Sequence, residues 1–502
     1  MKLKELKRIL SIAMITIMCT AVTACSSQTS EVSSSEETSI TQEVEAQENE
    51  ASGQDQEVEA KDVADGEMPE GEAPDGQPGE MPDGEAPGNP PDGEGGGNSS
   101  TDIDYTGATT ITSADSQDGE TYESDTADES ALLITTSDDV TISNGTVTKT
   151  GDSDGGDNCN FYGLNAAVLV KDGSTTTITG MTITSDADGA NGVFSYGGNG
   201  GQNGAEGDGT TVIISDSTIT TTGDGSGGIM TTGGGITKAS NLTVETSGRS
   251  SAAIRTDRGG GTVTVDGGTY TTNGLGSPAI YSTADITVSD ATLVSNLSEG
   301  VCIEGINSIT LNDCDLTANN TDTNGNATFY DSIMIYQSMS GDADSGTSTF
   351  TMNGGSLTSM NGHVFHVTNT TAVINLEDVE IVNEDSDNIL LSVCADGWTG
   401  DNNTATVNAS NQTLEGTILV GDDSELTLNL TNGSSFTGTI NGEITNASGE
   451  TVSTEVGTVS VSIDTGSTWT LTADTYISSF DGDISSVNTN GYTLYVDGVA
   501  MN

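Results

Sequence analysis

The segment VTISNGTV, residues 140–147, is the first of nine similar segments that decide the fold of this chain. Apolar residues alternate on both sides of a central Asn, Asp or Gly, as in two short strands joined by a tight bend. The segments follow one another at 23 to 26 residues, with three longer intervals of 36, 36 and 41. This spacing indicates stacked coils with inserted loops. The later segments are TTITGMTI, TVIISDSTI, ITKASNLTV, VTVDGGTY, ITVSDATL, ITLNDCDL, FTMNGGSL and INLEDVEI.

The bend in each segment is predicted at a residue that tolerates left-handed backbone, because Gly, Asn and Asp adopt it more readily than other types. One such residue can turn a strand into the next without a long loop. The nine predicted bend residues are Asn144, Gly180, Asp216, Asn241, Gly267, Asp290, Asp313, Gly354 and Asp378.

A third strand is predicted further along each coil, in segments such as AAVLVK (166–171) and GVCIE (300–304). Three strands per coil predict an all-β fold, a right-handed three-sheet parallel β-helix, in which each coil extends its neighbour's core. An antiparallel β-sandwich would not need the same bend residue at every period. The repeat over about residues 130–400 resembles the pectate-lyase-like β-helix superfamily.

The predicted domains follow from this repeat. Residues 134–400 form the β-helix, 101–133 an N-terminal cap, and 401–502 a looser C-terminal continuation and cap, similar to passenger segments of autotransporter adhesins. The formal charge is −65, with 76 Asp and Glu against 11 Lys and Arg. Such a surface repels phosphates, which argues against a nucleic-acid partner.

The N-terminal residues predict export and anchoring. Residues 1–24 have a basic start and an apolar stretch, as in a signal peptide. The tetrapeptide VTAC that ends at Cys25 resembles the lipobox of bacterial lipoproteins, and the resemblance implies acylation of Cys25. Residues 25–100, rich in Glu, Asp, Pro and Gly, predict a disordered, extended linker. We therefore expect a monomer on the outer face of a Gram-positive cell membrane, held by its lipid anchor alone.

Alternation along the third strands separates predicted core residues from outward-facing ones. The inward column is expected to contain Val168, Ile229, Ile254, Ile280, Val301, Ile333 and Val364. The outward column is expected to contain Phe194, Met230, Arg255, Tyr281, Cys302, Met334 and Phe365, with Tyr196, Asp257, Glu304 and Tyr336 two positions further along.

The outward column predicts a glycan-binding surface, because aromatic rings stack on sugars and charged groups bind hydroxyls or carboxylates. In the resembled superfamily this kind of exterior sheet commonly lines the saccharide groove. Arg255 either binds such a glycan or pairs internally with Asp257 or Glu304. The expected ligand-binding residues are Phe194, Tyr196, Arg255, Arg258, Tyr281, Tyr336 and Phe365.

Catalytic and metal-binding candidates are fewer. Asp257 and Glu304 lie two coils apart, and their side chains could span the carboxylate separations that glycosidases use; Arg255 is the candidate base of a lyase. His366 is expected to face the core and His363 to start a strand. Four loop aspartates are either calcium ligands, the one cofactor that the sequence suggests, or parts of solvated turns: Asp152, Asp154, Asp186 and Asp188.

The leading hypothesis is a lipid-anchored adhesin or glycan-binding protein that contacts a glycan, a host surface or a neighbouring cell through the outer face of the third sheet. One alternative is a lyase or hydrolase of acidic, pectin-like polysaccharides on the same scaffold. The other is a structural spacer that binds nothing.

Overall fold

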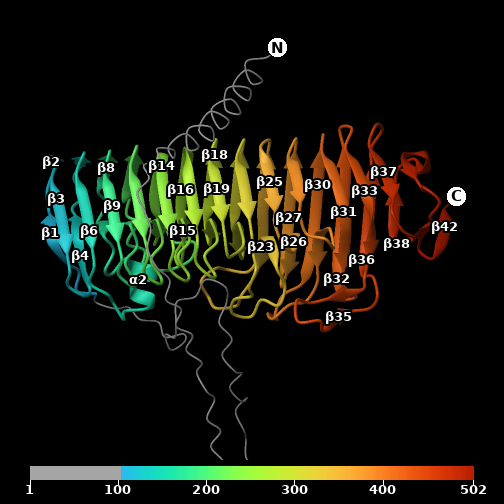
Figure 1. Ribbon diagram of the computed structural model, residues 1–502, viewed down its shortest axis with the longest axis horizontal. Helices are drawn as coiled ribbons and strands as arrows, with labels where there is room; N and C mark the ends of the chain where they lie inside the picture. Colours follow the sequence, from blue (N-terminus) through green and yellow to red (C-terminus); the bar gives the residue numbers. More distant parts are fainter. Residues whose placement is uncertain (1–102, 502) are drawn as a thin grey trace, which may run out of the picture. The chain divides into compact units, whose positions relative to one another are not determined.

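The computed structural model describes residues 103–501. The predicted signal peptide (1–24), Cys25 and the predicted linker (25–100) lie outside the described residues. Within them the chain is almost entirely β-structure, and its strands stack in parallel coil upon coil (Figure 1). The predicted fold class, a right-handed three-sheet parallel β-helix, is confirmed.

The third strands of successive coils form one sheet of fifteen strands, which we call the third sheet. Every neighbouring pair in it is parallel. Its strands, in spatial order, are β1 (Thr106–Ile111), β4 (Glu129–Thr135), β7 (Val168–Lys171), β10 (Val193–Tyr196), β13 (Ile229–Thr232), β15 (Ile254–Thr256), β17 (Ile280–Ser282), β20 (Val301–Glu304), β23 (Asp331–Tyr336), β26 (His363–Thr368), β29 (Ile389–Val393), β31 (Thr413–Val420), β33 (Ser435–Asn441), β37 (Thr468–Leu471) and β40 (Val487–Asn488).

The first strands of the coils form another parallel array, which we call the first array. This array shares two long strands, β14 and β16, with the array of second strands, so the two are joined in one hydrogen-bonded sheet. The first array contains β2 (Asp115–Asp118), β5 (Val140–Ser143), β8 (Thr175–Thr179), β11 (Thr211–Ser215), β14 (Gly235–Thr246), β16 (Gly261–Thr272), β18 (Asp285–Ser289), β21 (Ser308–Asn312), β24 (Thr347–Asn353), β27 (Thr370–Glu377), β30 (Asn403–Ser410), β32 (Ser424–Thr431), β36 (Thr458–Ile463) and β39 (Ser479–Asp481).

The second array is shorter than the first. Beside the far halves of β14 and β16 it contains β3 (Thr121–Ser124), β6 (Thr146–Lys149), β9 (Thr182–Ser185), β12 (Thr218–Thr221), β19 (Thr292–Ser295), β22 (Asp315–Ala318), β25 (Ser356–Ser359) and β28 (Glu380–Asn383).

The bend between first and second strands lies where the sequence predicts it. All nine predicted bend residues have left-handed backbone, with φ between +49° and +72°. Side chains also link bends in neighbouring coils: the Asn144 amide donates to Asp118 at 2.8 Å, and the Asn241 amide to Asp216 at 2.7 Å. These bonds offset part of the strain of about 1–2 kcal/mol that a non-glycine residue meets there.

A continuous apolar core runs inside the stack. In the third sheet its inward column passes from Val168 through Val193, Ile229, Ile254, Ile280 and Val301 to Ile333, as expected. The next residue in register is Phe365, not Val364. The placement of Phe365 in the outward column is therefore wrong: its ring packs edge-on against Phe350 in the core, and His366 takes the outward position beside Met334.

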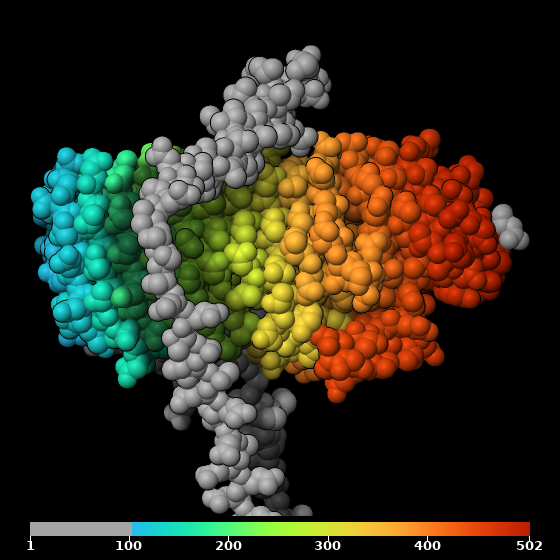
Figure 2. All heavy atoms as spheres, viewed as in Figure 1, coloured from blue at the N-terminus to red at the C-terminus, as the bar shows by residue number. Residues whose placement is uncertain are grey.

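Insertions of different length leave the coils along one edge of the stack (Figure 1). The first contains the helix α2 (Asp157–Tyr162), and a later one contains the antiparallel strands β34 (Ile444–Thr445) and β35 (Thr451–Ser453). Figure 2 shows successive coils as adjoining bands of colour. Residues that are distant in sequence therefore come into contact where one coil stacks on the next and where the insertions touch.

The two ends of the stack differ. Strands β1 to β3 already pair in parallel with β4 to β6, so they form its first coil. At the other end the 3-10 helix η1 (Ile484–Ser486) precedes β40. A small sheet closes that end, made of β38 (Thr475–Ile477), β41 (Leu494–Val496) and β42 (Val499–Met501).

The bend geometry predicts a specific sensitivity at Asp290, where φ is +54°. Asp290→Val should destabilise the fold by about 1–3 kcal/mol, because a β-branched residue tolerates left-handed backbone poorly. Asp290→Gly removes the same carboxylate without that strain and is the matched control. Thermal unfolding followed by circular dichroism measures both; equal unfolding temperatures for the two variants would contradict the bend assignment.

Candidate functional site

The outward column of the third sheet leaves the central core as predicted, but it is not open to solvent. Phe194, Met230, Cys302 and Met334 are each at most 1% exposed, and Tyr281 is 4% exposed. The expectation of an open aromatic surface is therefore wrong. The physical reason is that the insertions fold back over the sheet and bury its outer face.

Apolar clusters lie between the third sheet and these insertions, and two of them contain predicted site residues. The first joins Phe194, Tyr196 and Met230 to Phe161 and Tyr162 of α2. In the second, the rings of Tyr336 and Trp398 lie 4.9 Å apart and pack with Tyr281, Cys302, Met334, Ala252 and Ala327. These residues give the protein a second buried layer beside its core.

The two arginines of the predicted glycan site are held in ion pairs. Arg255 donates to Asp257 at 2.7 Å, and both side chains are almost fully buried. Arg258 donates to Asp342 at 2.6 Å and lies over the ring of Phe161, 4.2 Å from its centroid. Of the two readings of Arg255, internal pairing is the one that the structure bears out, and its partner is Asp257.

The two candidate catalytic carboxylates are also buried. Glu304 accepts hydrogen bonds from the hydroxyls of Tyr281 (2.6 Å), Tyr336 (3.1 Å) and Ser338. Burial raises the pKa of Glu304 and of Asp257, while Arg255 opposes the shift of Asp257. Neither carboxylate lines an open cleft: Glu304 and the Arg258–Asp342 pair hold loop 337–346 on the sheet, and Asp257 accepts hydrogen bonds from Arg255 and from the N–H of Arg258.

A second polar cluster surrounds the two histidines. The hydroxyl of Ser392 lies 2.7 Å from Nδ1 of both His363 and His366, and His366 Nε2 lies 3.3 Å from Asp396. These residue types occur in hydrolase triads, but Ser392 and His366 are fully buried. Burial lowers the pKa of His363 to about 3, which keeps it neutral. His366 faces this cluster and not the central core, so its predicted orientation is wrong; His363 does begin β26.

The four candidate calcium ligands do not converge. Asp152 accepts the backbone N–H of Asp188 at 3.0 Å, and Asp188 accepts that of Asp224 at 2.8 Å, so the carboxylates connect successive coils. Within residues 103–501 no group of three or more His, Cys, Asp or Glu side chains has an arrangement suited to a metal ion.

An open groove lies beside the covered sheet, where the third strand of a coil turns into the next first strand. Its volume is about 640 Å³, within the range of about 300–1,000 Å³ typical of ligand sites. The floor is formed by these turns in three successive coils, around Gly234, Gly260 and Thr283. One wall is residues 203–209, and the other includes Ile306, Asn307, Ala343 and Asp344.

The walls of the groove are tied to its floor and to each other. Asn203 accepts the N–H of Gly259 at 3.1 Å and donates to the carbonyl oxygen of Gly341 at 3.3 Å. Gly207 lies so close to the backbone that a Cβ there would meet the Gly234 oxygen at 2.2 Å. Insertion 197–209 therefore packs against the coil through glycine.

The chemistry of the groove is acidic and mixed. Its carboxylates are Glu206, Asp285 and Asp344, its amides are Asn203 and Asn307, and no basic side chain is among its lining residues. Ile306, 57% exposed, adds an apolar contact at the rim. Sequence reasoning missed these residues because they lie on turns, where strand periodicity carries no information. The available signal was the pair of insertions that border them.

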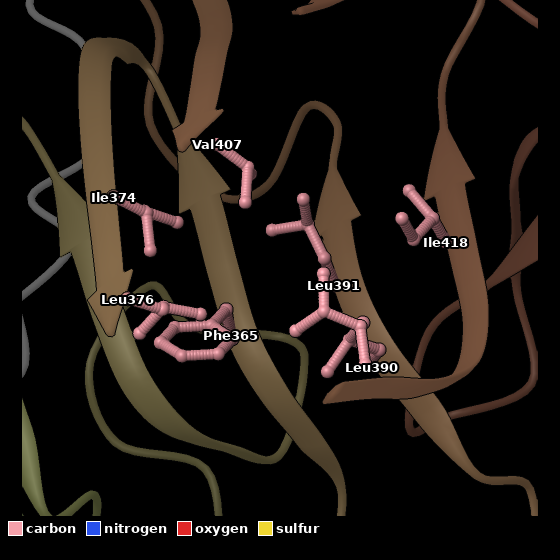
Figure 3. Close-up of a pocket in the computed structure, with 8 residues that line it drawn as sticks. Phe365, Ile374, Leu376, Leu390, Leu391, Val407 and Ile418 are labelled. Atoms are coloured by element: carbon pink, nitrogen blue, oxygen red, sulfur yellow. The ribbon is translucent and has the colours of Figure 1, made fainter. Parts of the chain in front are cut away.

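A second cavity, inside the core, is not a ligand site. It measures about 10 Å³ and is lined only by apolar side chains where β26, β27, β29, β30 and β31 meet (Figure 3). A void of this size without polar partners does not hold an ordered water.

No known protein family and no curated protein matches this sequence. Among residues 103–501, none of the helices has the length and apolar character needed to span a bilayer.

Because several carboxyl groups are buried, the stability of the folded state should depend on pH. Burial, with the neighbouring charges of Glu299 and Asp396, raises the pKa of Asp331 well above its usual value. The folded state then holds a proton that the unfolded state releases near pH 4. This contribution to stability is full below about pH 4 and is lost as pH rises through the raised pKa of the folded state.

Asp331→Asn removes this titrating group. The unfolding temperature of the wild type should fall between pH 5 and pH 8, and that of Asp331→Asn should fall less. Asp322→Asn, an exposed aspartate in the preceding loop, is the control and should keep the wild-type difference. An unchanged difference in Asp331→Asn would show that this carboxyl does not titrate as described.

Proposed function

We propose that this protein is a lipid-anchored, surface-displayed β-helix that binds a glycan, and that the groove between residues 203–209 and Asp344 is its binding site. The single observation that carries the proposal is that groove: an open, polar cavity of ligand size on a rigid scaffold. The proposed glycan site is therefore this groove and not the neighbouring outer face of the third sheet.

The lining supports a neutral or amino-bearing glycan over an acidic one. Carboxylates accept hydrogen bonds from sugar hydroxyls, and amides can both donate to hydroxyls and accept from them, because hydroxyls do both. Glu206, Asp285 and Asp344 repel uronate carboxylates, and Arg255 and Arg258 are engaged in buried ion pairs. Nothing in the groove therefore favours the pectin-like substrate of the enzymatic alternative.

Filling the groove tests its role. Thr262 lies on the groove floor, so Thr262→Trp should block binding and reduce retention on a neutral glycan array at least about tenfold. Thr264→Trp is the matched control, because Thr264 is exposed on the same face of β16 but does not line the groove. Equal retention of both variants and wild type would remove the groove from the proposal. Absence of wild-type binding to any glycan would favour a spacer.

The anchor is a separate part of the proposal and is tested at Cys25. Cys25→Ser removes the thiol that would carry the lipid, so the protein should move from the membrane fraction into the medium. Immunoblots of fractionated cells and incorporation of labelled palmitate measure this. A variant that stays in the membrane fraction would contradict lipid anchoring at this residue.

A further inference from the structure

The C-terminal sheet of β38, β41 and β42 has two different faces. Its inner face closes the core with Ile477 and Leu494, which are 4% and 0% exposed. Its outer face carries Tyr476, Tyr495 and Ala500 in one row across the three strands. We call these three residues the tyrosine ledge. It lies at the end of the stack opposite β1 (Figure 1).

The exposure of aromatic side chains is concentrated here. All twenty aromatic residues (7 Phe, 2 Trp and 11 Tyr) lie within the described residues 103–501, where only Tyr476 (50%) and Tyr492 (43%) are exposed. Tyr495 is partly exposed. The remaining aromatic side chains are buried or only partly exposed, so the exposed pair is not a general property of this surface.

The geometry of the ledge leaves one position vacant for a flat ring. Tyr476 and Tyr495 are direct neighbours in register, and their rings stack with centroids 4.6 Å apart and planes 6° apart. On the other side of Tyr495 the neighbour is Ala500, which is exposed and small. Because strands lie about 4.8 Å apart, a flat ring above Ala500 would continue the stack at the same spacing.

Charge and size restrict what occupies that position. The last Lys or Arg in the chain is Arg258, and Asp474 and Asp497 flank the ledge, so an anionic polymer or a second copy of this acidic chain is repelled. Three residues are also far fewer than the 20 to 30 residues per side, about 800 Å², of a stable protein interface.

A neutral sugar ring satisfies these restrictions. Its apolar face matches the open face of Tyr495, and its hydroxyls match polar groups next to the rings. Asp474 and Thr493 directly precede β38 and β41, two positions before Tyr476 and Tyr495. The Asp474 carboxylate already accepts the Thr493 N–H at 2.8 Å through Oδ1, and Oδ2 is its second acceptor.

We infer that the tyrosine ledge is a second glycan site, in which a neutral pyranose ring lies over Ala500 and stacks on Tyr495. The inference rests on the proposed glycan-binding function but uses a different surface from the groove. Two sites along one solenoid let a single chain contact an extended polysaccharide twice, which raises its effective affinity.

The test uses the purified full-length protein labelled with 3-fluorotyrosine and neutral hexasaccharides of glucose, xylose and mannose. At least one should shift the fluorine resonances of Tyr476 and Tyr495, assigned by single Tyr→Phe variants, in wild type and in Thr262→Trp. Tyr495→Ser and Ala500→Trp should each weaken binding about fivefold to tenfold, since one removes the stacking partner and the other fills its place. Tyr492→Ser changes an exposed tyrosine outside the ledge and should bind as wild type.

The outcomes separate the two proposals. Shifts at both tyrosines that persist in Thr262→Trp support the ledge whatever happens at the groove. Binding that Thr262→Trp abolishes, with no shift at Tyr476 or Tyr495, overturns the ledge and keeps the groove. Larger fluorine shifts with oligogalacturonate than with the neutral sugars would contradict the inference that the ledge binds a neutral ring. A wild type that binds no neutral hexasaccharide overturns the ledge, while the groove is decided by its own glycan-array test.

Discussion

From β2 to β28, each coil of this protein must change direction between its first and second strands within one residue, and the three-strand architecture depends on that constraint. The chain meets it with Asn, Asp or Gly in left-handed backbone at every predicted bend. Because the bend is the same in each of these coils, strands stay in register and apolar side chains stack into one continuous core. A chain with few large apolar residues can fold this way, since each coil completes the core of its neighbour.

The insertions convert the outer face of the third sheet into a second buried layer. Aromatic side chains from α2 and from loop 396–402 pack on it, and Arg255, Arg258, Asp257 and Asp342 are paired within it. Burying charges is unfavourable unless they are paired and hydrogen-bonded, and here they are. The loops are therefore part of the folded body, and the edge where they meet the coils is where an open groove remains.

The sequence was informative wherever the outcome depended on local periodicity. Bend positions and the orientation of residues from Val168 to Ile333 follow from alternation, and all were predicted. The error at Phe365 arose because the segment HVFHV offers apolar residues in both phases, so alternation does not decide between Val364 and Phe365. Burial of Tyr281 and Glu304 could not be predicted, because it depends on where distant insertions dock. The groove and the ledge depend on turns and on an end of the stack, which have no repeat.

The strands of each coil pair only with those of the coils before and after it, and this has an evolutionary consequence. Duplication or loss of a whole coil would lengthen or shorten the solenoid by about 4.8 Å without disturbing the residues at either extremity. Selection can thus change the length of the solenoid separately from the surface at its end. Chains with different numbers of coils would present the same terminal surface at different distances from the first coil.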